Sequence, residues 1–258
     1  MVSGMERYID YDPFAWLYAN YWGDDFHRQT VPALDRLLLQ HLPPGAAVLD
    51  LCCGDGRISR ELHRRGFVVT GLDGSERMLT LAQQRVPKAR FLLADARSFD
   101  LAEEFDAVLS TFDSLNHVMD ARELRRVFDN VHAALKPAGW FVFDVNREQA
   151  YFDFWAHDSH TVDAGAVSVA RGAYNQRTRI ATCDVTLFER DGLNWQRSDF
   201  RLTQRYHPPE TVMSALTRAG FSAQRLDAAT DLKIEGDIGQ GRDFYLARKT
   251  AGEIVQPA

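Results

Sequence analysis

Cysteine is scarce in this chain of 258 residues, which contains three, two of them adjacent at positions 52 and 53. Neighbouring cysteines rarely have the geometry of a disulfide bridge, so a disulfide framework is excluded. No run of about 18 apolar residues exists, which excludes a transmembrane helix. Positive charge is short as well, since 30 Lys and Arg face 36 Asp and Glu and give a formal net charge of −6. We therefore expect a globular protein whose partners are neither nucleic acid nor membrane.

The first 22 residues are acidic and aromatic, and they lack the basic start and unbroken apolar centre of a secretory signal. Internal repeats and low-complexity segments are absent too. These features predict a cytoplasmic protein.

Short apolar runs alternate with helical segments through the first part of the chain. Such runs are typical of buried parallel strands, and they cover residues 46–51, 67–73, 89–95, 105–112 and 140–146. Helices are expected after Gly56, after a capping Ser75 and over 121–139, where Pro-Ala-Gly ends the last one. The alternation predicts an α/β fold with a doubly wound, mostly parallel sheet, which strands at 221–227 and 243–249 complete to seven.

The pattern changes after residue 150. The segments 161–174, 178–190 and 193–207 are longer and partly alternating, and Asp191-Gly192 between the last two is a hairpin signal. We therefore predict a small antiparallel sheet inserted after strand five.

Polar groups follow the ends of the predicted strands, where an open parallel sheet binds its ligands. Gly54-Asp55-Gly56 allows a tight turn into a helix with free N–H groups, and Asp73 is placed to accept ribose hydroxyls. A nicotinamide enzyme fits these features too. Its fingerprint, however, needs a third Gly or Ala where this chain has Ser59. Asp50 would also repel a pyrophosphate, whereas it suits a ligand with an ammonium and a sulfonium.

The ordered recurrence of these motifs resembles the class I S-adenosylmethionine-dependent methyltransferases, which have a Rossmann-like fold. Their pattern of an acidic residue followed by x-Gly-x-Gly-x-Gly is matched by Asp50, Cys52, Gly54 and Gly56, with Cys52 in place of the first glycine. The resemblance implies that Asp73 and Gly74 hold the ribose and that Met78 packs against the adenine. It further implies that Asp95 and Ala96 contact the adenine amino group, and that Thr111 belongs to the cofactor site.

Within this class the chain is similar to the small-molecule N-methyltransferases that include glycine N-methyltransferase and nucleotide-sugar amine methyltransferases. The segment "YWGDDFHR" (21–28) implies that Arg28 binds the cofactor's carboxylate and that Tyr21 lines the methyl-transfer site. The segment "DSLNHV" (113–118) places His117 near the acceptor. Asn146 stands where glycine N-methyltransferase has the arginine that holds its substrate, which makes glycine an unsuitable acceptor.

The predicted function is methyl transfer from S-adenosylmethionine to a small molecule, with an amine acceptor favoured. His117 is a candidate base or a positioning residue, although a half-buried structural histidine is also consistent with the sequence. Tyr18 and Trp22 are expected to cover the cofactor, since their rings attract a sulfonium, and Trp22 and Asn146 to contact the substrate. No metal is expected, and a homo-oligomer stays open. The alternatives are a nicotinamide-dependent oxidoreductase and a non-catalytic cofactor-binding regulator.

The resemblance divides the chain into three parts. Residues 1–45 form an N-terminal helical lid, 46–150 with 207–250 form the S-adenosylmethionine-binding domain, and 151–206 form the sheet that covers the substrate. Cys52 is expected to provide a small residue beside the cofactor without a positive φ, and its neighbour Cys53 to serve packing.

Overall fold

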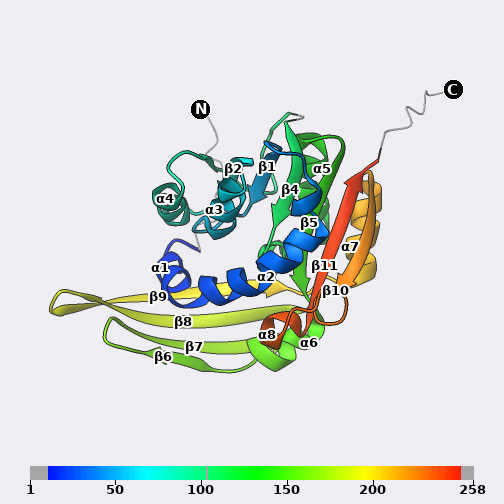
Figure 1. Cartoon of the computed structure of the whole chain (residues 1–258). Coiled ribbons are helices and arrows are strands. Elements are labelled where there is room, and N and C mark those ends of the chain that lie inside the picture. Colours follow the sequence, from blue (N-terminus) through cyan, green and yellow to red (C-terminus); the bar gives the residue numbers. More distant parts are fainter. Residues whose placement is uncertain (1–10, 103, 251–258) are drawn as a thin grey trace, which may run out of the picture.

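The protein is built on two sheets in a computed structural model that describes residues 11–102 and 104–250 (Figure 1). The larger sheet has seven strands in the order β10-β11-β5-β4-β1-β2-β3. Its strands are β1 (Ala47–Leu51), β2 (Val68–Asp73), β3 (Arg90–Leu93), β4 (Phe105–Ser110), β5 (Leu135–Asn146), β10 (Phe221–Asp227) and β11 (Arg242–Lys249). β1 to β5 pair in parallel, whereas β11 is antiparallel to both of its neighbours. The predicted α/β fold with a mostly parallel seven-stranded sheet is confirmed.

Helices cover both faces of this sheet. Buried side chains of α5 (Ala121–Ala134) and α7 (Pro209–Arg218) pack with β4, β5 and β11 on one face, whereas α2 (Gly23–Leu37) and α3 (Arg57–Arg64) pack on the other. α4 (Glu76–Arg85) begins at Ser75, whose hydroxyl accepts the N–H of Met78, as the capping pattern predicts. Chain order reverses between β1 and β4, so the carboxyl ends of the strands open a crevice there.

The second sheet has four antiparallel strands in the order β6-β7-β8-β9 and follows β5 in the chain. The strands are β6 (Ser159–Val162), β7 (Ala166–Asn175), β8 (Ile180–Asp191) and β9 (Asn194–Arg205). In Figure 1 this sheet lies below the larger one, and α1 (Ala15–Leu17) and α2 run along it. Phe14, Leu17 and Met78 pack with inward-facing residues of β7, β8 and β9, so the N-terminal segment joins the two sheets.

Two local predictions need correction. The helix predicted over 121–139 ends at Ala134, because Pro137 disfavours a helical residue before it and Leu135 is already extended. The segment 161–174 is broken by a turn, in which the carboxylate of Asp163 accepts the N–H groups of Gly165 (2.7 Å) and Ala166 (2.8 Å).

The remaining helices are short. They are the turns Tyr18–Trp22, Leu39–His41, Ser114–His117 and Tyr151–Trp155, with α6 (Glu148–Ala150) and α8 (Gly236–Gly239). Among the described residues, no helix is long and apolar enough to cross a membrane.

Candidate active site

One cavity of about 380 Å³ lies at the carboxyl ends of β1, β2 and β4 and reaches the inner face of β8 and β9. It brings together most of the predicted site residues. These are Tyr18, Trp22, Asp50, Cys52, Gly54, Asp73, Gly74, Met78, Asp95, Ala96, Thr111, His117 and Asn146. The cavity therefore joins the predicted cofactor site to the predicted acceptor site.

Three predicted residues lie outside the cavity lining. The side chain of Arg28 is 72% exposed and pairs with Asp25, so its placement argues against the cofactor-carboxylate role. The hydroxyl of Tyr21 donates to Asp163 of the inserted sheet instead of facing the cavity. Gly56 has a φ of 78°, and a Cβ there would lie 2.9 Å from Ala82, so this glycine serves the contact of α3 with α4.

The turn after β1 is held by Asp73, whose carboxylate accepts the N–H groups of Gly54 (2.8 Å) and Ser75 (2.9 Å). Gly54 has a φ of 52°. Cys52 has a φ of 59°, so the expectation that it needs no positive φ is wrong. Cys52 therefore takes the left-handed conformation, which is uncommon for a residue with a Cβ. The Cβ of a residue at Gly71 would lie 2.9 Å from the Cys53 sulfur, so Cys53 fills the space beside that glycine.

Two acids in the cavity, the buried Asp50 and the half-buried Asp73, have raised pKa values. Burial raises the pKa of Asp50 to about 7, with the charge of Asp73 adding to the shift and a hydrogen bond from Ser59 opposing it. Burial likewise raises the pKa of Asp73 to about 6, against backbone hydrogen bonds from Ser75, Gly54 and Gly74. A cationic ligand would favour the charged form of both acids. Burial also raises the pKa values of the Cys52 and Cys53 thiols, which therefore stay protonated at neutral pH.

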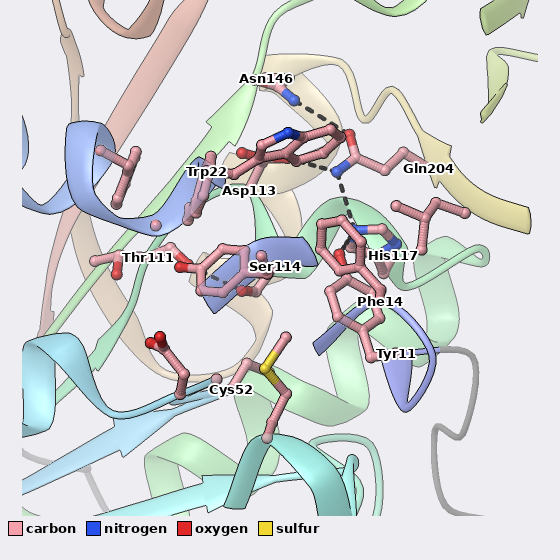
Figure 2. A pocket seen from close by; sticks show the side chains of 18 of the residues that line it. Tyr11, Phe14, Trp22, Cys52, Thr111, Asp113, Ser114, His117, Asn146 and Gln204 are labelled. Atoms are coloured by element: carbon pink, nitrogen blue, oxygen red, sulfur yellow. Dashed lines mark hydrogen bonds between the residues drawn. The ribbon is translucent and has the colours of Figure 1, made fainter. Parts of the chain in front are cut away.

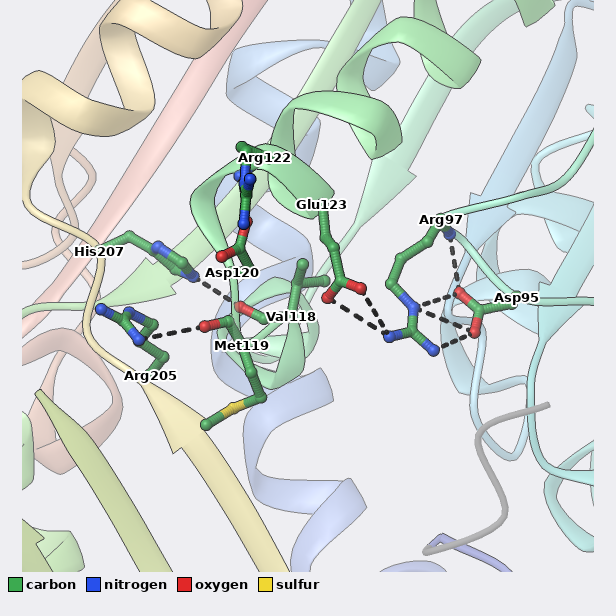
Figure 3. A network of polar contacts seen from close by, with 9 residues as sticks. All are labelled: Asp95, Arg97, Val118, Met119, Asp120, Arg122, Glu123, Arg205 and His207. Carbon is green, nitrogen blue, oxygen red and sulfur yellow. Dashed lines mark hydrogen bonds and ion pairs between the residues drawn. The ribbon is translucent and has the colours of Figure 1, made fainter. Parts of the chain in front are cut away.

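Asp95, after β3, is linked through an arginine to α5 (Figure 3). Arg97 donates from Nη2 to the Asp95 carboxylate at 2.6 Å and from Nη1 to Glu123 at 3.4 Å. The backbone N–H of Arg97 also donates to Asp95, at 2.8 Å. The backbone N–H and the guanidinium of Arg97 together hold the Asp95 carboxylate at the cavity wall. Ala96, the next residue in the chain, lines the cavity as well.

The end of the cavity predicted to hold the methyl acceptor, called the acceptor end below, is centred on His117, in the turn after β4 (Figure 2). Its Nδ1 lies 2.8 Å from the carbonyl oxygen of Thr203, which can only accept, so Nδ1 carries the proton. Nε2 therefore has the lone pair, and it meets the Gln204 amide at 3.0 Å and the Tyr11 hydroxyl at 2.5 Å. In this tautomer the cavity side of the imidazole is a hydrogen-bond acceptor.

Gln204 of β9 organises this end of the cavity. Its amide nitrogen donates to Asp113 (2.5 Å) as well as to His117, while its oxygen accepts from Asn146 (3.1 Å) and Tyr151 (3.2 Å). Both N–H groups and both lone pairs of the Gln204 amide have a partner, so these contacts fix which way the amide points. Gln204 was not predicted, because the inserted sheet carries no motif that singles it out.

Two buried arginines were missed for a similar reason. Arg242 of β11 is paired with Asp113 and Asp144, and its guanidinium lies 5.2 Å from the centroid of the Phe26 ring. Arg57 joins Asp55 of the cofactor turn to the N-terminal segment. In the sequence these two arginines resemble ordinary surface arginines, and only the fold shows that they are buried.

Rings from the N-terminal segment line the space between the two ends. Phe14 lies edge-on to Tyr11 and to Trp22, with ring centroids 5.1 and 5.0 Å apart. Tyr11 is in turn edge-on to His117, at 5.0 Å. Such a wall excludes water and attracts cations to the faces of its rings.

A parallel sheet with an acidic, glycine-containing turn after β1 and acids after β2 and β3 is typical of a class I S-adenosylmethionine-dependent methyltransferase. The comparisons agree: the family described as "Methyltransferase domain" matches residues 48–139. A putative methyltransferase, YqeM of Bacillus subtilis (strain 168), is 32% identical over 215 residues, which are 81% of this chain and 86% of that protein. This chain therefore belongs to the S-adenosylmethionine-dependent methyltransferase family, and it is an enzyme of that kind.

Further relatives are named as amine methyltransferases. The dTDP-3-amino-3,6-dideoxy-alpha-D-glucopyranose N,N-dimethyltransferase of Streptomyces fradiae is 30% identical over 206 residues, or 78% of this chain and 80% of that one. The solved sugar N-methyltransferase KedS8 from Streptoalloteichus sp ATCC 53650 shares the fold, with a TM-score of 0.75 and 22% identity over 91% of this chain and 92% of that one. Family membership decides against the nicotinamide oxidoreductase and the non-catalytic regulator.

The donor set fits S-adenosylmethionine. Asp73 can hold two ribose hydroxyls, since each of its oxygens uses one backbone N–H and keeps a further lone pair. Asp50 could provide a buried carboxylate for the ammonium, and Asp95 could accept from the adenine amino group. Among the described residues, no cluster of three or more His, Cys, Asp or Glu side chains could hold a metal ion.

Proposed function

We propose that this enzyme methylates an amine nitrogen of a small molecule. The observation that carries the proposal is the acceptor-only Nε2 of His117, in the cavity that also contains the cofactor turn. An amine N–H is a donor that can take the place of the Tyr11 hydroxyl or the Gln204 amide at this nitrogen. Among the relatives, the enzyme of Streptomyces fradiae is named for dimethylation of an amino sugar, which supports an acceptor of that class.

In this proposal the residues position the acceptor and remove its proton. S-adenosylmethionine supplies an electrophilic methyl group on a sulfonium, which leaves as a neutral thioether. Trp22 and Asn146 contact the acceptor, and the aromatic wall keeps water away from the amine lone pair. His117, assisted by Tyr11, orients the amine N–H and can take up the proton that the new N–C bond makes acidic. The cofactor roles of Asp50, Asp73, Asp95 and their neighbours belong to the same proposal.

The test is product formation with S-adenosylmethionine and a panel of small amines, alcohols and carboxylic acids. We expect methylated amines and S-adenosylhomocysteine in equal amounts for the first methylation. Methylation of alcohols or carboxylates alone would contradict the amine assignment.

Variants then test the acceptor end. His117→Ala should lower the rate by about 10²-fold if the histidine handles the proton, with S-adenosylhomocysteine affinity nearly unchanged. Thr161→Ala, on the outlying strand β6, serves as the control. Unaltered turnover in His117→Ala would show that the histidine is structural.

The division into lid, binding domain and covering sheet remains part of this proposal, as do a cytoplasmic location and a possible self-association. The first ten residues of the lid lie outside the described residues. Cell fractionation and sedimentation of the purified protein test the last two points.

A further inference from the structure

We infer that the acceptor is a neutral or cationic amine that carries no nucleoside diphosphate, and that Asp237 attracts its charge. This inference rests on the proposed function and narrows its substrate class. It separates the enzyme from its relative in Streptomyces fradiae, which is named for a dTDP-linked sugar.

A diphosphate would need cationic side chains in the cavity. Among the described residues, the cavity is lined by three arginines and no lysine. Each arginine is already held by two carboxylates: Arg57 by Asp24 and Asp55, Arg97 by Asp95 and Glu123, and Arg242 by Asp113 and Asp144.

These arginines are therefore neutralised before any ligand binds. The side chains of Arg57 and Arg242 are 7% and 8% exposed, so turning either towards a phosphate would break a buried ion pair, that of Arg57 with Asp55 or that of Arg242 with Asp144. Breaking a buried ion pair in this way is strongly unfavourable. A diphosphate would find no ready cation among them.

The side chains that line the cavity carry more negative than positive charge. Six aspartates line the cavity, against the three arginines. Three of the aspartates pair with those arginines, which leaves Asp50, Asp73 and Asp237 without an arginine partner among the described residues. This excess of acid repels a diphosphate and attracts a cation, because charges inside a low-dielectric cleft are poorly screened. The rings of Tyr11, Phe14 and Trp22 offer further cation-attracting faces in the same cavity.

Asp237 lies in α8. It lines the cavity, is exposed, and has no hydrogen bond or ion pair with another residue in the part of the chain that the structure describes. The other lining aspartates are buried, half-buried or used by the cofactor turn. Asp237 is thus the carboxylate available to an incoming ammonium group, which must lose a proton before it attacks the methyl carbon.

The experiment compares two methyl acceptors with the full-length enzyme and S-adenosylmethionine. One is 3-amino-3,6-dideoxyglucose and the other is its dTDP ester. We expect kcat/KM to be at least about tenfold higher for the free amino sugar, and preference for the dTDP ester would overturn the inference. Calorimetry of dTDP against the complex with S-adenosylhomocysteine gives an answer that does not need turnover: no binding at millimolar dTDP supports the inference, and saturable binding overturns it.

Variants test the rim carboxylate. Asp237→Asn should raise KM for a cationic amine about fivefold at low salt, and the difference should fade in 0.5 M salt as screening increases. Glu235→Gln removes the same charge two residues away, outside the cavity lining, and is the matched control. Equal KM values in the two variants would overturn the role of Asp237. Failure of every amine in the panel, with dTDP still excluded, would count against the proposed function and not against the exclusion of the diphosphate.

Discussion

At the scale of single residues, the acids of the cofactor site are held where a charge is costly. Asp50 is 2% exposed, and its nearest donor is the hydroxyl of Ser59, at 2.6 Å. A neutral hydroxyl offsets little of the lost hydration of a carboxylate. A cationic ligand group beside Asp50 would supply the missing charge, so the site is matched to an ammonium rather than to a phosphate.

The pKa of Asp50 leads to a test of proton release. Because the pKa of this acid is raised to about 7, the folded protein binds its proton more tightly than the unfolded chain does. Its contribution to the free energy of unfolding is therefore full below the ordinary value near 4 and is lost as the pH rises through about 7. Cofactor binding should reverse this by favouring the carboxylate, so that binding at pH 6.5 releases protons and binding at pH 8.5 does not.

Calorimetry in two buffers of different ionisation enthalpy measures the number of protons. Asp50→Asn should release fewer protons at pH 6.5 than the wild type. The remainder comes from Asp73, whose pKa is raised to about 6. Equal release from the two proteins would contradict the assignment of Asp50.

Cys52 gives a second prediction at this scale. Its φ of 59° is uncommon for a residue with a Cβ and is a severe strain for a β-branched one. Cys52→Val should therefore lower the free energy of unfolding by about 1–3 kcal/mol, although valine is apolar and of similar size. Cys52→Gly should change it by less than about 1 kcal/mol, because relief of strain offsets the lost contacts. Urea denaturation of both variants measures the difference, and a Val variant as stable as the Gly variant would show that the turn adapts.

At the scale of elements, Arg57 ties the cofactor turn to the N-terminal segment. From the first turn of α3 its guanidinium donates to the carbonyl of Ala19 (2.8 Å) and the carboxylate of Asp24 (2.8 Å), and it pairs with Asp55. A Cβ on Gly23 would lie 2.8 Å from its Nη1, so the glycine of this helix start is the space for the arginine. Arg57 therefore links the segment that carries Tyr18 and Trp22 to the cofactor turn.

Removal of this side chain should be felt in both places. Arg57→Met should lower the free energy of unfolding by about 3 kcal/mol, since it removes one of the two arginines that pair with the buried Asp55 and the side-chain donor to the Ala19 carbonyl. It should also weaken S-adenosylhomocysteine binding, because Tyr18 and Trp22 lose their anchor to the turn. Gly23→Ala should show both effects more weakly. Denaturation and calorimetry together decide: lower stability with unchanged affinity would make Arg57 a purely structural residue.

At the scale of the whole molecule, the sequence predicts the framework better than the acceptor site. Strand ends such as Asp73 and Asp95 follow from the alternation of strands and helices, because parallel strands share one edge. Gln204 and Arg242 come from strands β9 and β11, distant in sequence from His117 and Asp113, and only tertiary pairing brings them together. The motif predicts Arg28 beside the cofactor, whereas the structure leaves its side chain outside the cavity lining, because a motif fixes spacing along the chain and not the direction in which a helix presents a side chain.

Because the cavity is built from both sheets and the segment between them, cofactor binding should stabilise the molecule as a unit. S-adenosylhomocysteine at about 100 times its Kd should add about 2.7 kcal/mol to the free energy of unfolding, which raises Tm by about 5–10 °C for a chain of this size. Asp73→Asn retains one acceptor oxygen and loses the carboxylate that the ribose hydroxyls need, so its own shift should be much smaller at the same concentration. Thermal unfolding with and without S-adenosylhomocysteine measures each shift against the variant's own Tm, which separates lost affinity from lost stability. A full shift in Asp73→Asn would remove this aspartate from the cofactor site, whereas a full shift in Asp237→Asn is expected, because that residue serves the acceptor.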